Sequence, residues 1–276
     1  MKLNIVGGMP KSGSTLFCNI LNQNPAFHAS DTSPVGVGVR NALWSLTSRP
    51  EFTSELAKDE KGARARVLEA CRGVAEGWYS ATEEPYVFDK DRSNAWAAQH
   101  ELFHALYPES IMVLLVRDPR EVLARILHQR RKDPMLLPGV ELASSLLANQ
   151  EEELMGPRGL VGMAASTVEN TLREARASEV NTDYIKVVAY EQLVNHPKRV
   201  FEHIYESLEL DPFEHDFDDV KDVSQDLDVL YRNQWLHKGS GKVVSKNPTW
   251  PGILPPGLAQ KTLQRFPLLC SVMQYR

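Results

Sequence analysis

The sequence predicts an α/β fold, a three-layer sandwich in which a central, mostly parallel sheet is flanked by helices. Two observations carry this prediction. Short apolar runs, each ending at a turn signal, alternate with longer helical patterns, as in strands joined by crossover helices. No low-complexity segment interrupts the 276 residues, and a chain of this length can bury one full core. We therefore expect a single domain over residues 1–276.

The expected elements follow from these patterns in chain order. Strands are expected over residues 3–6, 86–89, 111–116 and 184–189. Helices are expected over residues 15–22, 61–78, 95–106, 119–131, 141–154, 162–177 and 198–208. From about residue 225 to 276 glycines and prolines recur, so we expect a loop-rich segment that covers the sheet. Loops at the carboxyl ends of parallel strands commonly hold ligands, and we expect the site there.

Composition argues against several classes of protein. The formal net charge of −5 disfavours a general nucleic-acid binder, which carries an excess of basic residues. No apolar run approaches the roughly 20 residues of a membrane span, and the N-terminus leads into a predicted strand without a signal peptide. The cysteines, Cys18, Cys71 and Cys270, lack metal-ligand spacing and fit reduced thiols. We expect a soluble cytoplasmic protein without a bound metal.

The first functional motif is a turn between the first expected strand and the first expected helix. It reads Gly7-Gly8-Met9-Pro10-Lys11-Ser12-Gly13-Ser14-Thr15-Leu16. This pattern predicts a P-loop-like cradle in which backbone N–H groups and the helix N-terminus bind an anion. In the triphosphate loop G-x-x-x-x-G-K-[ST] a lysine follows the last glycine, whereas Ser14 stands there and Lys11 precedes Gly13. The pattern therefore favours a shorter phosphorylated group over ATP; a turn without a ligand is the alternative.

The second motif follows the third expected strand and reads Arg117-Asp118-Pro119-Arg120. Asp118 and Pro119 suit the cap and the first position of a helix, so Arg117 is fixed at the carboxyl end of the strand. A guanidinium matches a phosphate through paired donors, and each charge-assisted contact contributes on the order of 1.5–3 kcal/mol. Arg117 is therefore a candidate phosphate clamp. Pairing of Arg117 with Asp118 or Glu121 is the alternative.

Together these motifs resemble those of sulfotransferases that use 3′-phosphoadenosine-5′-phosphosulfate (PAPS), in particular the bacterial and tyrosylprotein-sulfotransferase-like branch. The resemblance implies that backbone amides from Ser12 to Leu16 hold the 5′-phosphate, while Lys11 lies near the bridging oxygen that becomes the leaving group. It also implies that Arg117 binds the 3′-phosphate. Arg125 occupies the position where the family usually has a serine, and it either adds a second cation or pairs with Glu121.

A third motif lies at the end of the second expected strand and reads Tyr86-Val87-Phe88-Asp89-Lys90-Asp91-Arg92. The resemblance implies that Lys90 stabilises the transferring group. Arg92 stands where small-molecule sulfotransferases carry their histidine base. The tyrosylprotein branch instead uses a glutamate about twenty residues beyond the loop, and Asp31 is the nearest carboxylate to that position, with His28 in reserve. The alternatives are a solvated charge cluster for Lys90 and a turn former for Asp31.

Two further motifs complete the resemblance. Tyr190-Glu191-Gln192-Leu193 resembles the family's Y-E-D-L segment, whose tyrosine lies near the adenine nucleotide. His237-Lys238-Gly239 resembles the R-K-G segment that closes over the 3′-phosphate, with a histidine that offers fewer donors than the arginine. The alternatives are a tyrosine that fixes a helix start and a flexible basic loop.

The resemblance implies in-line transfer of a sulfuryl group from PAPS to an acceptor hydroxyl, with adenosine 3′,5′-bisphosphate (PAP) as product and no metal. The acceptor is a small molecule, a saccharide or a peptide, bound by loops that vary within the family, here residues 29–46, 136–158 and 233–251. Two other functions stay open: a P-loop kinase acting on a small molecule or nucleotide, and a catalytically silent nucleotide-binding module. The sequence says nothing about oligomeric state.

Overall fold

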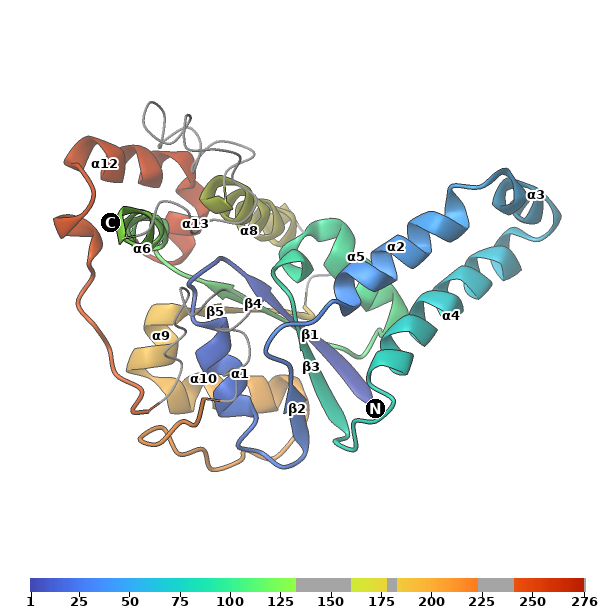
Figure 1. Ribbon diagram of the computed structural model, residues 1–276, viewed down its shortest axis with the longest axis horizontal. Helices are drawn as coiled ribbons and strands as arrows, with labels where there is room; N and C mark the ends of the chain where they lie inside the picture. The colour runs from blue at the N-terminus through green and yellow to red at the C-terminus, as the bar shows by residue number, and fades with distance from the viewer. Residues whose placement is uncertain (133–159, 178–182, 223–240, 276) are drawn as a thin grey trace.

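The computed structural model describes residues 1–132, 160–177, 183–222 and 241–275. Within these ranges the chain forms a five-stranded sheet in the order β2-β3-β1-β4-β5 (Figure 1). The strands are β1 (Lys2–Gly8), β2 (Phe27–Ala29), β3 (Tyr86–Lys90), β4 (Met112–Val116) and β5 (Ile185–Ala189). Every pairing within this sheet is parallel, which confirms the predicted α/β class.

The register of the sheet brings the predicted site motifs to one edge. Val6 of β1 lies opposite Lys90 of β3, and Gly8 lies opposite Leu115 of β4. On the far side of β4, Val116 lies opposite Ala189 of β5. Because the strands are parallel, all of their carboxyl ends meet at this edge, where α/β sheets place their ligands.

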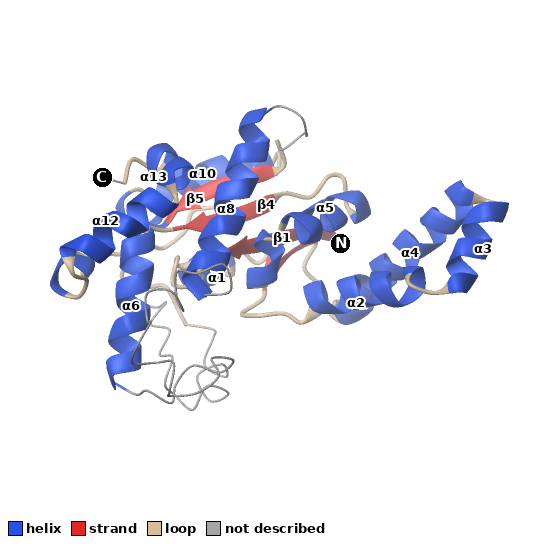
Figure 2. Ribbon diagram, turned by 90° about the horizontal axis from the view of Figure 1, so that it is seen from above, coloured by secondary structure: helices blue, strands red, loops and turns tan. Residues whose placement is uncertain are grey.

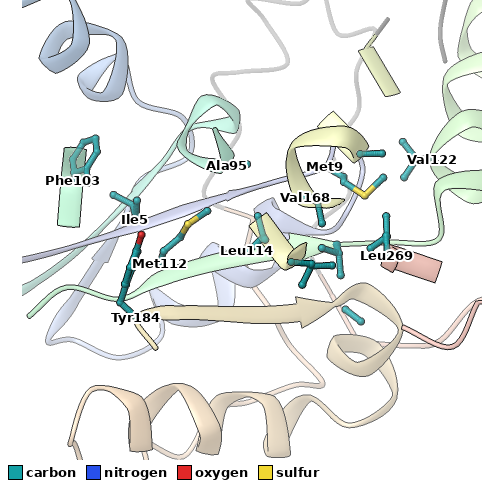
Figure 3. Packing of buried hydrophobic residues seen from close by; sticks show 14 of the residues in the cluster. Ile5, Met9, Ala95, Phe103, Met112, Leu114, Val122, Val168, Tyr184 and Leu269 are labelled. Carbon is teal, nitrogen blue, oxygen red and sulfur yellow. The ribbon is translucent and has the colours of Figure 1, made fainter. Parts of the chain in front are cut away.

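Helices cover both faces of the sheet and form the outer layers. On one face lie α1 (Ser14–Leu21) and α10 (Pro197–Ser207), with Phe17 and Phe201 stacked at 5.1 Å between ring centroids. On the other face α5 (Ala97–Leu106), α6 (Pro119–Lys132) and α8 (Leu160–Ala177) pack on the sheet (Figure 2). Buried side chains fill this second layer from strands and helices alike, among them Ile5, Phe103, Met112, Leu114 and Val168 (Figure 3).

The predicted elements that fall on described residues are observed, with ends that differ by one or two residues. Besides two short 3₁₀ helices, six further elements of the described residues were not predicted from the sequence. They are the strand β2 and the helices α2 (Val35–Thr47), α3 (Pro50–Lys58), α9 (Tyr190–Asn195), α12 (Pro256–Arg265) and α13 (Pro267–Val272). The expected helix over residues 141–154 lies outside the described residues. None of the helices that the structure describes is long and apolar enough to cross a membrane.

Helices α2, α3 and α4 (Glu60–Trp78) form an arm that projects away from the sheet (Figure 1). The prediction of a loop over residues 29–46 is wrong for most of its length. Glycines at positions 36 and 38 lower helix propensity, but packing of α2 against α4 compensates. Val39 is buried there, and a Cβ on Gly38 would lie 3.3 Å from Val74, so the small residue permits close approach of the two helices.

The end of the chain is more helical than expected. Residues 241–249 are irregular, as predicted, but α12 and α13 follow a 3₁₀ turn at Trp250–Gly252. Pro256, one of the prolines that suggested a loop, occupies the first position of α12, and Pro267 occupies that of α13; at this position the missing N–H is harmless. The backbone amides of Leu268 and Leu269 donate to the buried carboxylate of Glu169 at 2.9 and 2.7 Å, which stabilises the start of α13.

Candidate active site

The turn after β1 has the backbone geometry of a cradle. The Ser12 hydroxyl donates to the carbonyl of Met9 at 2.6 Å, and the Met9 amide donates to the Leu115 carbonyl at 3.0 Å. Lys11 takes up a left-handed conformation with a φ of 60°, and Gly13 follows with a φ of 88°. Alternation of ordinary and left-handed residues turns successive N–H groups toward one side, which is how anion nests form.

The N-terminus of α1 faces the same space. Gly13 is its N-cap, and no side chain caps the helix. The first N–H groups of a helix have no partner within the helix, and they carry its positive dipole end. The amides predicted to hold a phosphate, including those of Ser14, Thr15 and Leu16, therefore belong to a helix start without a side-chain cap, the kind of start that binds anions.

Gly13 also brings Tyr190 into the site. A Cβ at Gly13 would lie 2.7 Å from Cδ2 of Tyr190, so the ring of this tyrosine lies against the turn. Tyr190 begins α9 directly after β5. Tyr190 therefore stands at the start of a helix with its ring against the predicted anion cradle.

Arg117 is a buried residue that joins the two predicted phosphate sites. It is 6% exposed, and its Nη1 donates to the carbonyl of Lys11 at 2.9 Å. Its guanidinium carbon lies 3.7 Å from the centroid of the Tyr190 ring, a distance typical of cation–π contact. Its Nε is buried and makes no hydrogen bond with the described residues. Burial lowers the pKa of Arg117, and the nearby charge of Arg125 adds to the effect.

Glu121 lies one helical turn beyond Arg117 and contacts both candidate arginines. Its Oε1 is 3.6 Å from Nη2 of Arg117 and 2.9 Å from Nε of Arg125. The pairing alternatives drawn from the sequence are thus present for Arg117 with Glu121 and for Arg125 with Glu121. These ion pairs keep the two guanidiniums next to each other, because both contact the same carboxylate oxygen of Glu121.

The Glu121 carboxylate also binds the end of the chain, which the sequence did not indicate. It accepts hydrogen bonds from the Thr249 amide at 2.8 Å, the Thr249 hydroxyl at 2.9 Å and the Trp250 amide at 3.1 Å. Burial by itself would raise the pKa of Glu121, but the Thr249 donors and the two arginine charges bring it below its usual value. Glu121 is therefore an ionised carboxylate shared by α6 and the tail.

The neighbouring residues confirm the predicted helix cap. Asp118 accepts a hydrogen bond from the Arg120 amide at 2.9 Å, and the Arg120 side chain folds back onto the same carboxylate, with Nη2 at 2.7 Å. The Arg120 guanidinium lies 4.2 Å from the ring centroid of Trp250. The Arg120 guanidinium is thus held by Asp118 and Trp250. The Arg117 guanidinium instead contacts the loop after β1.

Lys90 lies across the site from α1. Its Nζ donates to Oγ1 of Thr15 at 3.2 Å, which confirms that the end of β3 and the loop after β1 share one space. The Lys90 amide donates to the Ser30 hydroxyl at 2.8 Å, and the Ser33 amide donates to the Lys90 carbonyl at 2.9 Å. The segment that carries Asp31 is therefore fastened on both sides of that residue to the backbone of Lys90.

Electrostatics agrees with this placement of Asp31 and Lys90. Burial raises the pKa of the Cys18 thiol on α1 to about 12, and the charges of Lys90 and Asp31 both act on that pKa in opposite directions. The two side chains therefore approach the same part of α1. His28, the reserve base, lies on β2 with its ring centroid 5.8 Å from that of Tyr79 at the base of the arm.

A buried carboxylate beneath Lys90 was missed in the sequence. Asp89 is fully buried, and it accepts hydrogen bonds from the Tyr79 hydroxyl at 2.6 Å and from Nδ2 of Asn94 at 3.3 Å. Burial raises its pKa, and these hydrogen bonds partly oppose the shift. The signal that could have revealed it is an acidic residue inside an apolar strand, directly before the candidate lysine.

Part of the predicted site lies outside the described residues, namely His237, Lys238 and Gly239. Within the described ranges, no group of three or more His, Cys, Asp or Glu side chains is arranged to hold a metal ion. The loop residues, Thr15, Lys90, Arg117, Arg125 and Tyr190 come together at the carboxyl edge of the sheet.

Solved structures with a similar fold include a sulfotransferase domain and a bacterial sulfotransferase. A sulfotransferase domain from the curacin biosynthetic pathway has 15% sequence identity and a TM-score of 0.51, and the match covers 99% of this chain and 97% of that one. A sulfotransferase from Alicyclobacillus acidocaldarius has 14% identity and a TM-score of 0.50, with 100% and 96% covered. At such identities the likeness shows a shared fold.

The sequence itself carries a stronger match. A family model described as the sulfotransferase family matches residues 5–215, a stretch that includes β1, the loop after it and the strand ends that carry Lys90, Arg117 and Tyr190. More than half of the chain is therefore matched, and the chain belongs to the sulfotransferase family.

Proposed function

We propose that this sulfotransferase takes PAPS as its donor and transfers the sulfuryl group to an acceptor hydroxyl. The observation that carries the proposal is the 2.9 Å hydrogen bond from Arg117 to the carbonyl of Lys11. It joins a guanidinium at the end of β4 to the anion cradle at the end of β1. A donor that bears one phosphate at its 5′ position and another at its 3′ position suits two such sites held side by side.

The residues fit the two phosphates by their chemistry. The cradle offers backbone amides and a helix start without a side-chain cap, while Arg117 offers a buried Nε without a partner. Arg125 adds a second guanidinium next to it, 33% exposed and held by Glu121. Tyr190 provides a flat surface between the two sites. PAPS bound there would supply the sulfuryl group, and PAP would leave.

Lys11 and Lys90 supply positive charge on opposite sides of the transferred group. Lys11 stands in the turn, where its ammonium group neutralises charge on the bridging oxygen. Lys90, at 3.2 Å from the Thr15 hydroxyl, faces the sulfuryl oxygens. Groups aimed at developing charge typically contribute about 10²–10³ in rate each. Side-chain cations in these roles need no help from a metal.

Asp31 is the proposed general base that takes the proton from the acceptor hydroxyl. Its segment is fastened to Lys90 by the Ser30 and Ser33 hydrogen bonds, so the base is held near the group that is transferred. General base catalysis contributes roughly 10²–10⁴ in rate. His28 is less well placed for this role, because it faces Tyr79 on the arm side.

Calorimetric titration with PAP, AMP and Mg²⁺–ATP tests the donor site. We expect PAP to bind about 10–100 times more tightly than AMP, because the 3′-phosphate adds contacts to Arg117. Arg117→Gln should remove most of this difference. The matched control is Arg173→Gln, whose side chain is 66% exposed on α8. Equal affinity for PAP and AMP would overturn the proposal, and preference for Mg²⁺–ATP would favour a kinase.

Transfer itself is tested with [³⁵S]PAPS and a panel of phenols, alcohols, saccharides and tyrosine peptides. Labelled product that depends on Asp31 and Lys90 is the expected result. Tight PAP binding with no transfer to any acceptor would identify a silent binding module instead.

We also place the protein in the cytoplasm. Its three thiols, Cys18, Cys71 and Cys270, are buried and unbonded, and a reducing compartment keeps thiols in that state. Fractionation of cells that produce the tagged chain tests this placement.

A further inference from the structure

Helix α2 presents a stripe of side chains that leads from the candidate active site out along the arm. Val37, Arg40 and Trp44 are spaced by three and four residues, so they lie on one face of the helix. Val37 is 38% exposed and Trp44 is 71% exposed. At the centre of the stripe, Arg40 reaches Trp96, which lies just before α5 and is 37% exposed.

Arg40 is held in place by uncharged groups. Its Nη1 donates to Oε1 of Gln99 at 2.8 Å, and its guanidinium carbon lies 5.0 Å from the ring centroid of Trp96. Gln99 is itself fixed, because its Nε2 donates to the carbonyl of Gly36 at 3.0 Å. No carboxylate of the described residues lies within ion-pair distance of Arg40. The guanidinium is therefore oriented, while its charge is not neutralised by a partner.

Three other described arginines on the arm are paired with carboxylates. Arg64 pairs with Glu60 at 2.9 Å, Arg66 pairs with Glu55 at 3.1 Å, and Arg72 pairs with Glu69. These pairs lie on α3 and α4. Arg40 differs from them, because Gln99 and Trp96 hold its guanidinium in place of a carboxylate, and it is the arginine of the arm nearest to Asp31 in the sequence.

The distance of Arg40 from the reaction residues follows from the chain. Asp31 precedes Ser33, whose amide is bonded to the carbonyl of Lys90, and α2 begins two residues later at Val35. Arg40 lies five residues into the helix, or about 8 Å along its axis at 1.5 Å per residue. A group bound to Arg40 would therefore lie within the first turns of the helix that follows the Asp31 segment.

We infer that Arg40 and Trp96 form an acceptor subsite for an oxyanion, a carboxylate or a phosphate monoester, carried on an apolar body at the end opposite to the hydroxyl. The inference rests on the proposed transfer to a hydroxyl. Arg40 binds the oxyanion through the donors that Gln99 leaves available, and the exposed faces of Trp96 and Val37 contact the apolar body. The subsite selects acidic acceptors over neutral ones of the same shape.

The test compares three acceptors whose carboxyl carbon or phosphorus is the fourth atom from the ring: 4-(4-hydroxyphenyl)butanoate, its methyl ester, and the matched 2-(4-hydroxyphenyl)ethyl phosphate. Affinity for the PAP-saturated protein is measured by calorimetry, and sulfation by [³⁵S]PAPS is measured alongside. We expect the two anions to bind about tenfold more tightly than the ester, as one charge-assisted contact allows. Preference for one anion over the other identifies carboxylate or phosphate as the natural group.

Variants decide whether Arg40 is responsible. Arg40→Gln should bring the ratio of anion to ester affinity to about one, and Arg40→Glu should reverse it. Arg64→Gln, on the same arm, should keep the wild-type ratio. Equal affinity of the wild-type protein for anions and ester overturns the inference, as does an unchanged ratio in Arg40→Gln. Failure of PAP to bind at all would instead overturn the proposed donor site, so the two failures are distinguishable.

Discussion

The donor side and the arm that flanks the acceptor side are built in different ways. On the donor side the backbone fixes the geometry, through the left-handed residues Lys11 and Gly13 and through the Arg117 bond to a main-chain carbonyl. On the arm, side chains define the surface, and large ones such as Trp44 and Trp78 are exposed. The comparison teaches that the geometry of the proposed donor site depends on a few strained or buried positions, whereas the arm can vary its surface with little effect on the fold.

Replacing Lys11 should give the largest effect on the donor side. We expect Lys11→Ala to lower kcat by about 10²–10³, because a cation aimed at the leaving group is lost. The melting temperature should stay close to that of the wild type, since the side chain is only partly buried. Single-turnover kinetics with [³⁵S]PAPS measures the loss. Lys58→Ala, an exposed lysine of the arm, is the control, and a fully active Lys11 variant would contradict the mechanism.

Two glycine substitutions contrast the regions directly. Gly13→Ala forces an alanine to a φ of 88° and places its Cβ 2.7 Å from Tyr190, so we expect about 1–3 kcal/mol of lost stability and at least tenfold weaker PAP binding. Gly73→Ala on α4 meets no atom within 4 Å and should raise the free energy of unfolding by about 0.5–1 kcal/mol. Urea denaturation and calorimetry measure both. Similar effects of the two substitutions would contradict the difference between the donor side and the arm.

A lower pH should reduce the free energy of unfolding, because a histidine is buried in the core next to the arm. His100 on α5 is buried against the Tyr184 hydroxyl at 2.8 Å, and burial lowers its pKa to about 4. The unfolded chain binds a proton near pH 6.5, so stability falls as the pH drops from 7 through 5, by roughly 2 kcal/mol for this residue. Below pH 4 the folded form is protonated as well, and this contribution stops growing.

Variants assign the acid effect to one face of the sheet. His100→Asn should flatten the dependence of unfolding free energy on pH between 7 and 5. His215 lies beside Phe201, on the face of the sheet that α1 and α10 cover. Burial lowers its pKa to about 4 as well, so part of the pH dependence of the unfolding free energy should persist. If the pH dependence of the unfolding free energy were unchanged in His100→Asn, His100 would not be the group that titrates.

The smallest effect is expected on the arm surface. Trp44→Ala removes a side chain that is 71% exposed, so the free energy of unfolding should change by no more than about 0.5 kcal/mol. Affinity for PAP should not change. Thermal denaturation and PAP titration check both values, and a loss of several kcal/mol would mean that the arm is part of the folded core.

The contrast between the regions also explains what could be predicted from the sequence. The strands β1, β3, β4 and β5 and the loop after β1 are encoded by local patterns, apolar runs and glycines at fixed spacing, and these strands were predicted within one or two residues. Helix α2 was missed because its glycines disfavour a helix locally, while burial of Val39 against α4 supplies the stability. Tertiary contacts of this kind override propensity.

Contacts between distant parts of the chain were beyond reach for the same reason. Glu121 and Thr249 are 128 residues apart, and nothing near either residue indicates the other. Tyr79 and Asp89 are separated by only ten residues, but a turn and a change from helix to strand lie between them. Arg117 could be predicted because a single motif fixes its place at a strand end.

Glu121 connects the segment around Thr249 to the candidate donor site. Its buried carboxylate receives three hydrogen bonds from Thr249 and Trp250, and it also orients Arg117 and Arg125. A chain that stopped short of Thr249 would leave a buried anion with its arginines as its main partners, and those guanidiniums would be drawn away from any phosphate. Loss of the residues from Thr249 onward would thus disturb the proposed donor site, and it would also remove Leu254, Phe266 and Leu269 from the hydrophobic core.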